Sequence, residues 1–178
     1  MIASELDTET LLAQAAALVD GERDWVANAA NISALIGTQI PGLNWSGVYV
    51  LQGDGLVLGP FYGKPACVRI ALGSGVCGTA AQQRATIVVP DVHAFPGHIA
   101  CDPASQSEIV VPLLAADSAN RTDSAHRTDS PNPRTRLIGV LDIDSPYPAR
   151  FGAVERAFFE SVADLLVRSS DWPDRTQG

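Results

Sequence analysis

Three cysteines are the residues of this sequence best suited to chemistry. Cys67 lies in an apolar stretch, Cys77 in the glycine-rich stretch 73–78, and Cys101 in the polar segment 96–103. Free cysteines are often buried as small apolar side chains, which fits Cys67 and Cys77 well. Cys101 fits that interpretation less well, because its neighbours are polar and an accessible thiol reacts as the thiolate.

A zinc site is an alternative use of the same residues. Three cysteines with His98 or His93 would supply four tetrahedral ligands. However, no two cysteines have the two-to-four-residue spacing of zinc knuckles, and His98 with Cys101 is a weak pattern on its own. We therefore predict no metal site.

Carboxylates stand at the ends of two apolar stretches. Asp142 and Asp144 point the same way on a strand, and Glu108 opens the neighbouring stretch. Isolated acids at strand ends usually face solvent, but three together would form a negative pocket suited to an ammonium group. Trp45 and Tyr49 also share one strand face, where they either pack in the core or wall a pocket for a thioether or a cation.

Hydrophobic periodicity gives the elements that position these residues. It predicts helices at both ends and six strands between them, mostly in hairpin order. The fold class is therefore α+β, with a mainly antiparallel six-stranded sheet and the N- and C-terminal helices packed on it. The expected helices are 10–19, 22–40, 79–83 and one that begins near Val154, and the expected strands are 45–51, 56–61, 66–71, 86–89, 107–114 and 137–144.

Composition limits the possible partners. The chain has 178 residues, of which 46% are hydrophobic, and a formal net charge of −8. This size fits a single domain over 1–178, and the acidic charge argues against nucleic acid and anionic membranes as partners. The N-terminus lacks the basic start and apolar stretch of a secretory signal, so we expect a reducing, cytoplasmic location in which any disulfide is catalytic.

Residues 116–136 differ from the rest of the chain. They contain two imperfect copies of a hexapeptide, 119–124 and 125–130, and their only apolar residues are alanine and proline. Such a segment cannot bury an apolar face. We predict a disordered insertion at a hairpin tip, whose removal leaves activity intact.

The segments that carry these residues resemble the free methionine-(R)-sulfoxide reductases, a GAF-domain enzyme family. The resemblance runs from about Trp25 to Phe158, and its most specific part is the three cysteines in three matching segments together with the aromatic pair. It rests on the motifs 44–49 (NWSGVY), 59–67 (GPFYGKPAC), 73–78 (GSGVCG), 91–93, 101–102, 105–112 and 139–145. The insertion 116–136 is the departure.

The resemblance implies a single GAF domain with a defined reaction. Cys101 would attack the sulfoxide sulfur and become a sulfenic acid, which a second thiol would convert to an intramolecular disulfide. Cys67 is the expected resolving residue and Cys77 the alternate, and thioredoxin would reduce the disulfide without any cofactor. The substrate-binding residues would be Trp45, Tyr49, Glu108, Asp142 and Asp144, around free methionine sulfoxide.

Two other functions stay open at this level. One is a non-catalytic GAF sensor of a small molecule, and the other is a redox sensor that uses the same thiols. A pure sensor of small molecules has no need of Cys101, and we expect no effector domain beside this one. GAF domains often pair through their terminal helices, so we expect a homodimer.

Overall fold

Six strands form one antiparallel sheet in the computed structural model, which describes residues 7–97, 102–116 and 135–173. They are β1 (Trp45–Gln52), β2 (Gly55–Gly63), β3 (Arg69–Ala71), β4 (Ile87–Val89), β5 (Ser107–Ala116) and β6 (Thr135–Ser145). Their order across the sheet is β3-β2-β1-β6-β5-β4. The long strands β1, β6 and β5 are therefore neighbours, and both of their faces are covered.

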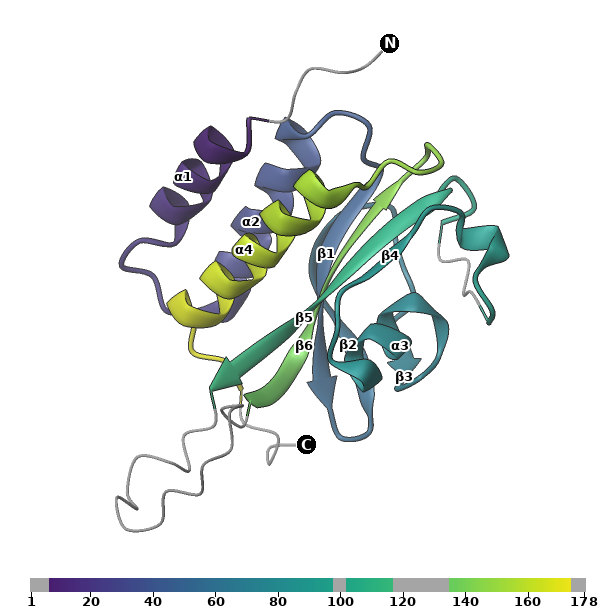
Figure 1. The fold of residues 1–178 in the computed structure, drawn as a ribbon. Coiled ribbons are helices and arrows are strands. Elements are labelled where there is room, and N and C mark those ends of the chain that lie inside the picture. The colour runs from purple at the N-terminus through teal and green to yellow at the C-terminus, as the bar shows by residue number, and fades with distance from the viewer. Residues whose placement is uncertain (1–6, 98–101, 117–134, 174–178) are drawn as a thin grey trace, which may run out of the picture.

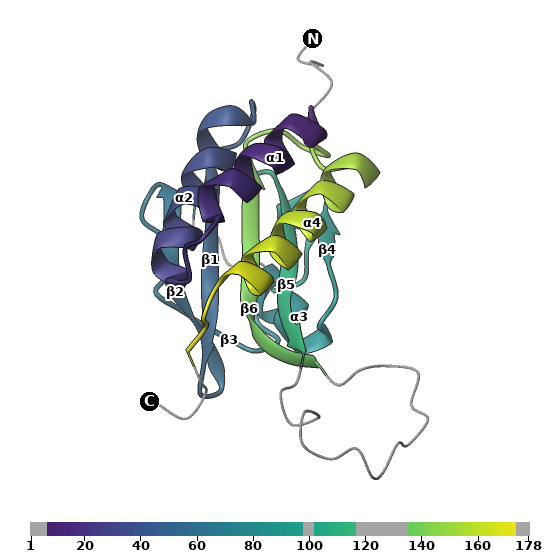
Figure 2. The same ribbon diagram turned by 90° about the vertical axis from the view of Figure 1, so that its left-hand side faces the viewer.

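Three helices lie on one side of the sheet, two of them packed on the strands and one packed on those two, and a fourth helix covers the other face (Figures 1 and 2). The first group is α1 (Thr8–Val19), α2 (Trp25–Gln39) and α4 (Ala153–Ser169), and the fourth is α3 (Gly75–Gln83). Acidic side chains fix where α1 and α2 begin. Asp7 accepts a hydrogen bond from the backbone N–H of Thr10, and Asp24 accepts from those of Val26 and Ala27.

Alternate residues of the central strands point into two separate cores. Val48, Ile109 and Leu141 join the core beneath α1, α2 and α4. Tyr49 and Val110, which point the opposite way, join the core beneath α3. This alternation follows from the pleat, since successive side chains of a strand point to opposite faces.

The structure confirms the predicted antiparallel sheet with helices at both ends. Two boundaries around the cysteines differ from the prediction. The third strand is only 69–71 rather than 66–71, so Cys67 precedes it. Helix α3 begins at Gly75 rather than at 79, because the Ser74 carbonyl already accepts from the Gly78 N–H at 3.0 Å. Cys77 therefore lies in the first helical turn and not in a bend.

The predicted insertion is also narrower than 116–136 where the structure describes it. Ala116 pairs with Thr135 and Ala115 with Arg136, so both ends of that stretch belong to the β5–β6 ladder. Residues 117–134 lie outside the described residues. Among the described helices, none is long and apolar enough to cross a membrane.

Candidate functional site

A small cavity of about 30 Å³ lies between the sheet, α3 and the turn at 102–105. Sheet, helix and turn all contribute side chains to its wall. The lining residues are Tyr49, Ile70, Ser74, Gly75, Val76, Cys77, Asp102, Ser105, Glu108, Asp142 and Asp144. Five of the eight predicted site residues are among them. The cavity thus brings one thiol and four carboxyl groups together in a small space.

Strand register brings the three predicted acids together. Glu108 on β5 is paired with Asp144 on β6, and Asp142 lies two residues back on the same face. Glu108 and Asp142 are buried, with 6% of each exposed, and Asp144 is half-buried. Trp45 and Gly47 of β1 are the partners of Asp144 and Asp142 on the other side. The carboxyl groups therefore face the cavity and not the solvent.

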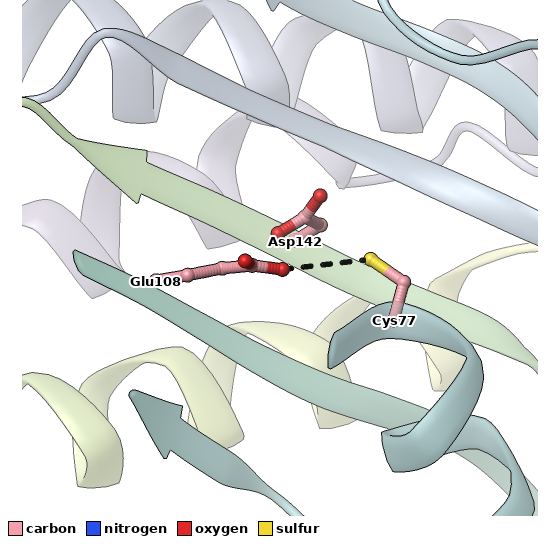
Figure 3. Close-up of side chains that lie close together, drawn as sticks. All are labelled: Cys77, Glu108 and Asp142. Carbon is pink, nitrogen blue, oxygen red and sulfur yellow. Dashed lines mark hydrogen bonds between the residues drawn. The ribbon is translucent and has the colours of Figure 1, made fainter. Parts of the chain in front are cut away.

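Cys77 joins two of these acids (Figure 3). Its Sγ lies 3.9 Å from Oε1 of Glu108, at the length of a weak hydrogen bond. The Cys77 sulfur and one oxygen each of Glu108 and Asp142 all lie within 4.8 Å of one another. The other carboxylate oxygen of Asp142, Oδ1, is buried without a hydrogen-bond partner among the described residues. An acceptor in that state is suited to a ligand that donates.

Cys77, Glu108 and Asp142 are also the group of described residues that could hold a metal ion. His93 is not among them, and it lies in the 3-10 helix η1 (Val92–Ala94). His98 and Cys101 fall outside the described residues. The described residues therefore do not assemble the cysteine–histidine zinc set that we weighed from the sequence.

The aromatic wall lies beside the acids. Trp45 stacks on Tyr49 with ring centroids 5.9 Å apart, and on Phe61 at 5.5 Å. The Trp45 indole N–H donates to the carbonyl of Lys64, and the Tyr49 hydroxyl donates to that of Cys67, each at 3.1 Å. These bonds hold the segment 64–67 against the cavity. Both aromatic side chains border a second hollow that also exposes Asp142 and Asp144.

The two cysteines that the structure describes are in different states. Cys67 is half-buried and disulfide-bonded, whereas Cys77 is a free thiol with 4% of its surface exposed. Cys101 lies outside the described residues, so its predicted place at the cavity stays a prediction. Asp102, the next residue along the chain, lines both hollows.

Comparison with known proteins identifies the family. The GAF domain model matches residues 8–169. Free methionine-R-sulfoxide reductase of Escherichia coli is 47% identical over 135 residues, which cover 76% of this chain and 71% of that protein. Its counterpart in Saccharomyces cerevisiae is 41% identical over 168 residues, covering 90% and 84%. The chain belongs to the free methionine-R-sulfoxide reductase family. The fRMsr of Staphylococcus aureus, solved in complex with substrate, superposes with a TM-score of 0.78 at 40% identity over 92% of this chain and 95% of that one.

Burial sets the protonation of the acids in this member of the reductase family. It raises the pKa of Glu108 well above its usual value, with the charges of Asp142 and Asp144 adding to the effect. Burial, then Asp142 and Asp102, raise the pKa of Asp144 in the same direction. The pKa of Asp142 rises only to about 6, because hydrogen bonds from Cys77 and Glu108 favour its charged form. Burial and mutual repulsion therefore favour the protonated forms of Glu108 and Asp144, while the pKa of Asp102 in the same cavity is lowered.

The same surroundings make Cys77 a poor nucleophile. Burial is the largest cause that raises the pKa of its thiol, followed by the charges of Asp142 and Glu108. Because the thiolate is the reactive form, a thiol held protonated attacks slowly. Among the cysteines of this reductase family member, Cys77 is therefore unsuited to begin the reaction.

Asp102 is a cavity residue that the sequence did not single out for a role. Its side chain is 5% exposed, and its carboxylate accepts from the Ala104 N–H at 2.9 Å, Asn44 Nδ2 at 3.2 Å and Lys64 Nζ at 3.3 Å. The backbone hydrogen bond from Ala104 is the largest of the causes that lower its pKa. Asn44 and Asp102 stand in two of the motifs that carry the resemblance, but their contact joins residues 58 positions apart. The sequence could thus have pointed to Asp102 only through its place in a motif. The contact between Asn44 and Asp102 becomes visible only in the folded structure.

Proposed function

We propose that this protein reduces free L-methionine (R)-S-oxide to L-methionine in the cytoplasm, with thioredoxin as the reductant. The observation that carries the proposal is the cavity in which strand ends bring Glu108, Asp142 and Asp144 together. A relative that is 40% identical over 92% of this chain was solved with its substrate, which supports the same use of the cavity here. The (R) configuration comes from the names of the curated relatives.

Cys101 is the proposed nucleophile. Its thiolate attacks the sulfoxide sulfur, the oxygen passes to the cysteine as a sulfenic acid, and methionine leaves. Two observations support this choice over Cys77: the raised pKa of the Cys77 thiol, and the place of Asp102, the neighbour of Cys101, in the cavity wall. The sulfoxide sulfur of the substrate is electrophilic enough for this attack only if its oxygen is protonated or strongly hydrogen-bonded.

Glu108 and Asp144 are the proposed proton donors. Burial raises the pKa of each, which favours the neutral form that can donate to the sulfoxide oxygen as negative charge develops on it. Asp142 remains as the carboxylate for the ammonium group of the substrate, with its Oδ1 atom available. Trp45 and Tyr49 would wall the thioether end. A cavity that must pair a free ammonium group excludes methionine sulfoxide within a polypeptide.

Cys67 is the proposed resolving residue. Its thiol would attack the sulfenic acid of Cys101, release water and form the disulfide that stores two oxidising equivalents. Cys67 is disulfide-bonded, whereas Cys77 is a free thiol, and this difference supports Cys67 over Cys77 as the resolving residue. Thioredoxin would return both cysteines to thiols.

A coupled assay tests the proposal. The full chain is incubated with thioredoxin, thioredoxin reductase, NADPH and racemic methionine sulfoxide, and we expect half of the sulfoxide to be consumed. Binding without consumption would favour a non-catalytic GAF sensor. A disulfide that forms and is reduced without methionine production would favour a redox sensor.

Cysteine variants assign the roles. Cys101→Ser is expected to abolish even a single turnover, because it removes the nucleophile. Cys67→Ser is expected to release one methionine per chain and then stall with thioredoxin, and Cys77→Ser serves as the matched control. If Cys101→Ser turned over normally and Cys77→Ser lost turnover, Cys77 and not Cys101 would be the nucleophile.

A further inference from the structure

Apolar side chains surround the disulfide-bonded Cys67 at the surface. Val68 directly follows it and is 65% exposed, and Phe61 at the end of β2 is 37% exposed. Pro65 is exposed as well, and Ala66 is half-buried. We call these four residues with Cys67 the Cys67 surface. Exposed apolar side chains beside a half-buried, disulfide-bonded cysteine offer a place for another molecule to pack.

The aromatic wall of the cavity holds the Cys67 surface in place from behind. Trp45 stacks on Phe61 and donates to the Lys64 carbonyl, while Tyr49 donates to the Cys67 carbonyl. The disulfide-bonded residue is thus fixed between the cavity and the outer surface.

Charge around the Cys67 surface contrasts with the rest of the chain. Residues 55–90 contain no aspartate or glutamate, although the whole chain has 20 of them. Lys64 and Arg69, both exposed, lie on either side of Cys67 in the sequence; Lys64 Nζ lies 3.3 Å from the carboxylate of Asp102, so Arg69 contributes most of the positive charge here. An acidic protein would be repelled by most of a chain with a net charge of −8, but not by this part of it.

We propose that the Cys67 surface is the docking site for a dithiol protein of the thioredoxin type, which reduces the disulfide by attack on Cys67. The inference rests on the proposed function, because that reaction leaves a disulfide to be reduced. An apolar centre with a basic rim fits a partner whose cysteine pair lies in an apolar surface and whose outer charge is acidic.

The exchange proceeds in two balanced steps. A thiolate of the reductant attacks the Cys67 sulfur, the disulfide of this protein breaks, and the other cysteine leaves as a thiolate that takes up a proton. The second thiolate of the reductant then attacks its own half of the mixed disulfide and releases Cys67, which is protonated in turn. Two electrons pass to this protein, which ends with two thiols, and the reductant ends with a disulfide.

Val68→Ser tests the apolar centre. We expect the KM for thioredoxin to rise about fivefold, because a central apolar contact is lost on docking. Turnover with dithiothreitol should stay unchanged, since a small dithiol has no need of the surface. The matched control is Val154→Ser on α4, an exposed valine (59%) of the opposite helix layer, for which both reductants should behave as with the unaltered chain.

Arg69→Glu tests the charge. It places an acid on the rim, so the second-order rate with thioredoxin is expected to fall about tenfold at low salt and to recover at high salt. The rate with dithiothreitol should stay constant. Equal losses with both reductants, or no change with thioredoxin in either variant, would overturn the docking site.

A trapping experiment tests the attacked atom. Thioredoxin that lacks its second cysteine is expected to remain joined to Cys67, which peptide mapping identifies. A bond to Cys77 or Cys101 would overturn the inference. Failure of the unaltered chain to form methionine with either reductant would instead remove the proposed function, and turnover with dithiothreitol but with no dithiol protein would remove the docking site alone.

Discussion

The same strands form both faces of the sheet, but the two faces carry different types of side chain. Beneath α1, α2 and α4, the strands present a continuous apolar set that includes Val48, Ile109 and Ile143. Beneath α3, the intervening positions of those strands present Glu108 and Asp142 together with apolar side chains. Successive residues of one strand therefore point to different surroundings, the first to an apolar core and the next to a cavity lined by carboxyl groups.

This difference shows how the fold tolerates its cavity. A buried carboxyl group without a cationic partner destabilises a protein, and Glu108, Asp142 and Asp144 lie together in the cavity. The helix layer offsets that cost through apolar burial, with Phe159 and Leu166 fully buried in it. Changes on the helix face should thus alter stability, and changes on the cavity face should alter activity.

The largest effect is expected on the helix face. Phe159 is fully buried and packs edge-on against Phe158 and Phe151, at centroid distances of 5.2 and 6.2 Å. Phe159→Ala should lower the free energy of unfolding by about 3–5 kcal/mol, because it leaves a cavity in the core. Urea unfolding at 25 °C measures this, and sulfoxide reduction per folded molecule should stay normal. A loss below about 1 kcal/mol would contradict the role given to this face.

Removing a proton donor on the cavity face should reverse that pattern. Asp144→Asn and Glu108→Gln are each expected to lower kcat/KM for methionine sulfoxide about 100-fold, because an amide cannot transfer a proton. The free energy of unfolding should not fall, since each change removes a buried acid. Steady-state kinetics beside urea unfolding separate the two effects. Unchanged kinetics would remove that residue from the site.

The pH dependence of stability should also reflect the raised pKa of the buried acids. Glu108 has a folded-state pKa raised above its ordinary 4.5 by burial, so its contribution to stability is complete below that value and is lost as the pH rises towards the folded pKa. Glu108→Gln should therefore gain stability relative to the unaltered chain from pH 5 to pH 8, as measured by urea unfolding at each pH.

Asp102→Asn is the control of opposite sign. The pKa of Asp102 is lowered, so its contribution is present above 3.8 and is lost as the pH falls through the folded value. This variant should be less stable than the unaltered chain at neutral pH, and the difference should shrink in acid. Parallel curves for the two variants would contradict the assigned charge states.

The smallest effect is expected far from both faces. Ala116 and Thr135 are the last partners of the β5–β6 ladder, at the end opposite to Glu108 and Asp144. Replacing residues 117–134 with Asn-Gly, a favoured two-residue hairpin turn, should change kcat/KM by less than about twofold. A large loss of turnover would show that this segment contributes to the site.

Much of the fold could be read from periodicity and turn residues. The apolar stretches at 45–51, 107–114 and 137–144 predicted β1, β5 and β6, and the apolar repeat around Phe158 predicted the last helix. The errors fell where local signals compete. Residues 66–68 have a strand-like composition but follow Pro65, which has no N–H to donate, and the glycine-rich stretch at 73–78 allowed either a bend or a helix start.

The sequence by itself determined the types of group in the site: the thiols, the acids on one strand face and the paired aromatics. Tertiary structure decided which of them meet and in what charge state. Asn44 and Lys64 reach Asp102 across 58 and 38 positions of chain, and Cys77 reaches Glu108 across 31. Such contacts depend on how strands and helices pack, and a pKa depends on the burial that this packing creates, so neither is encoded in local spacing.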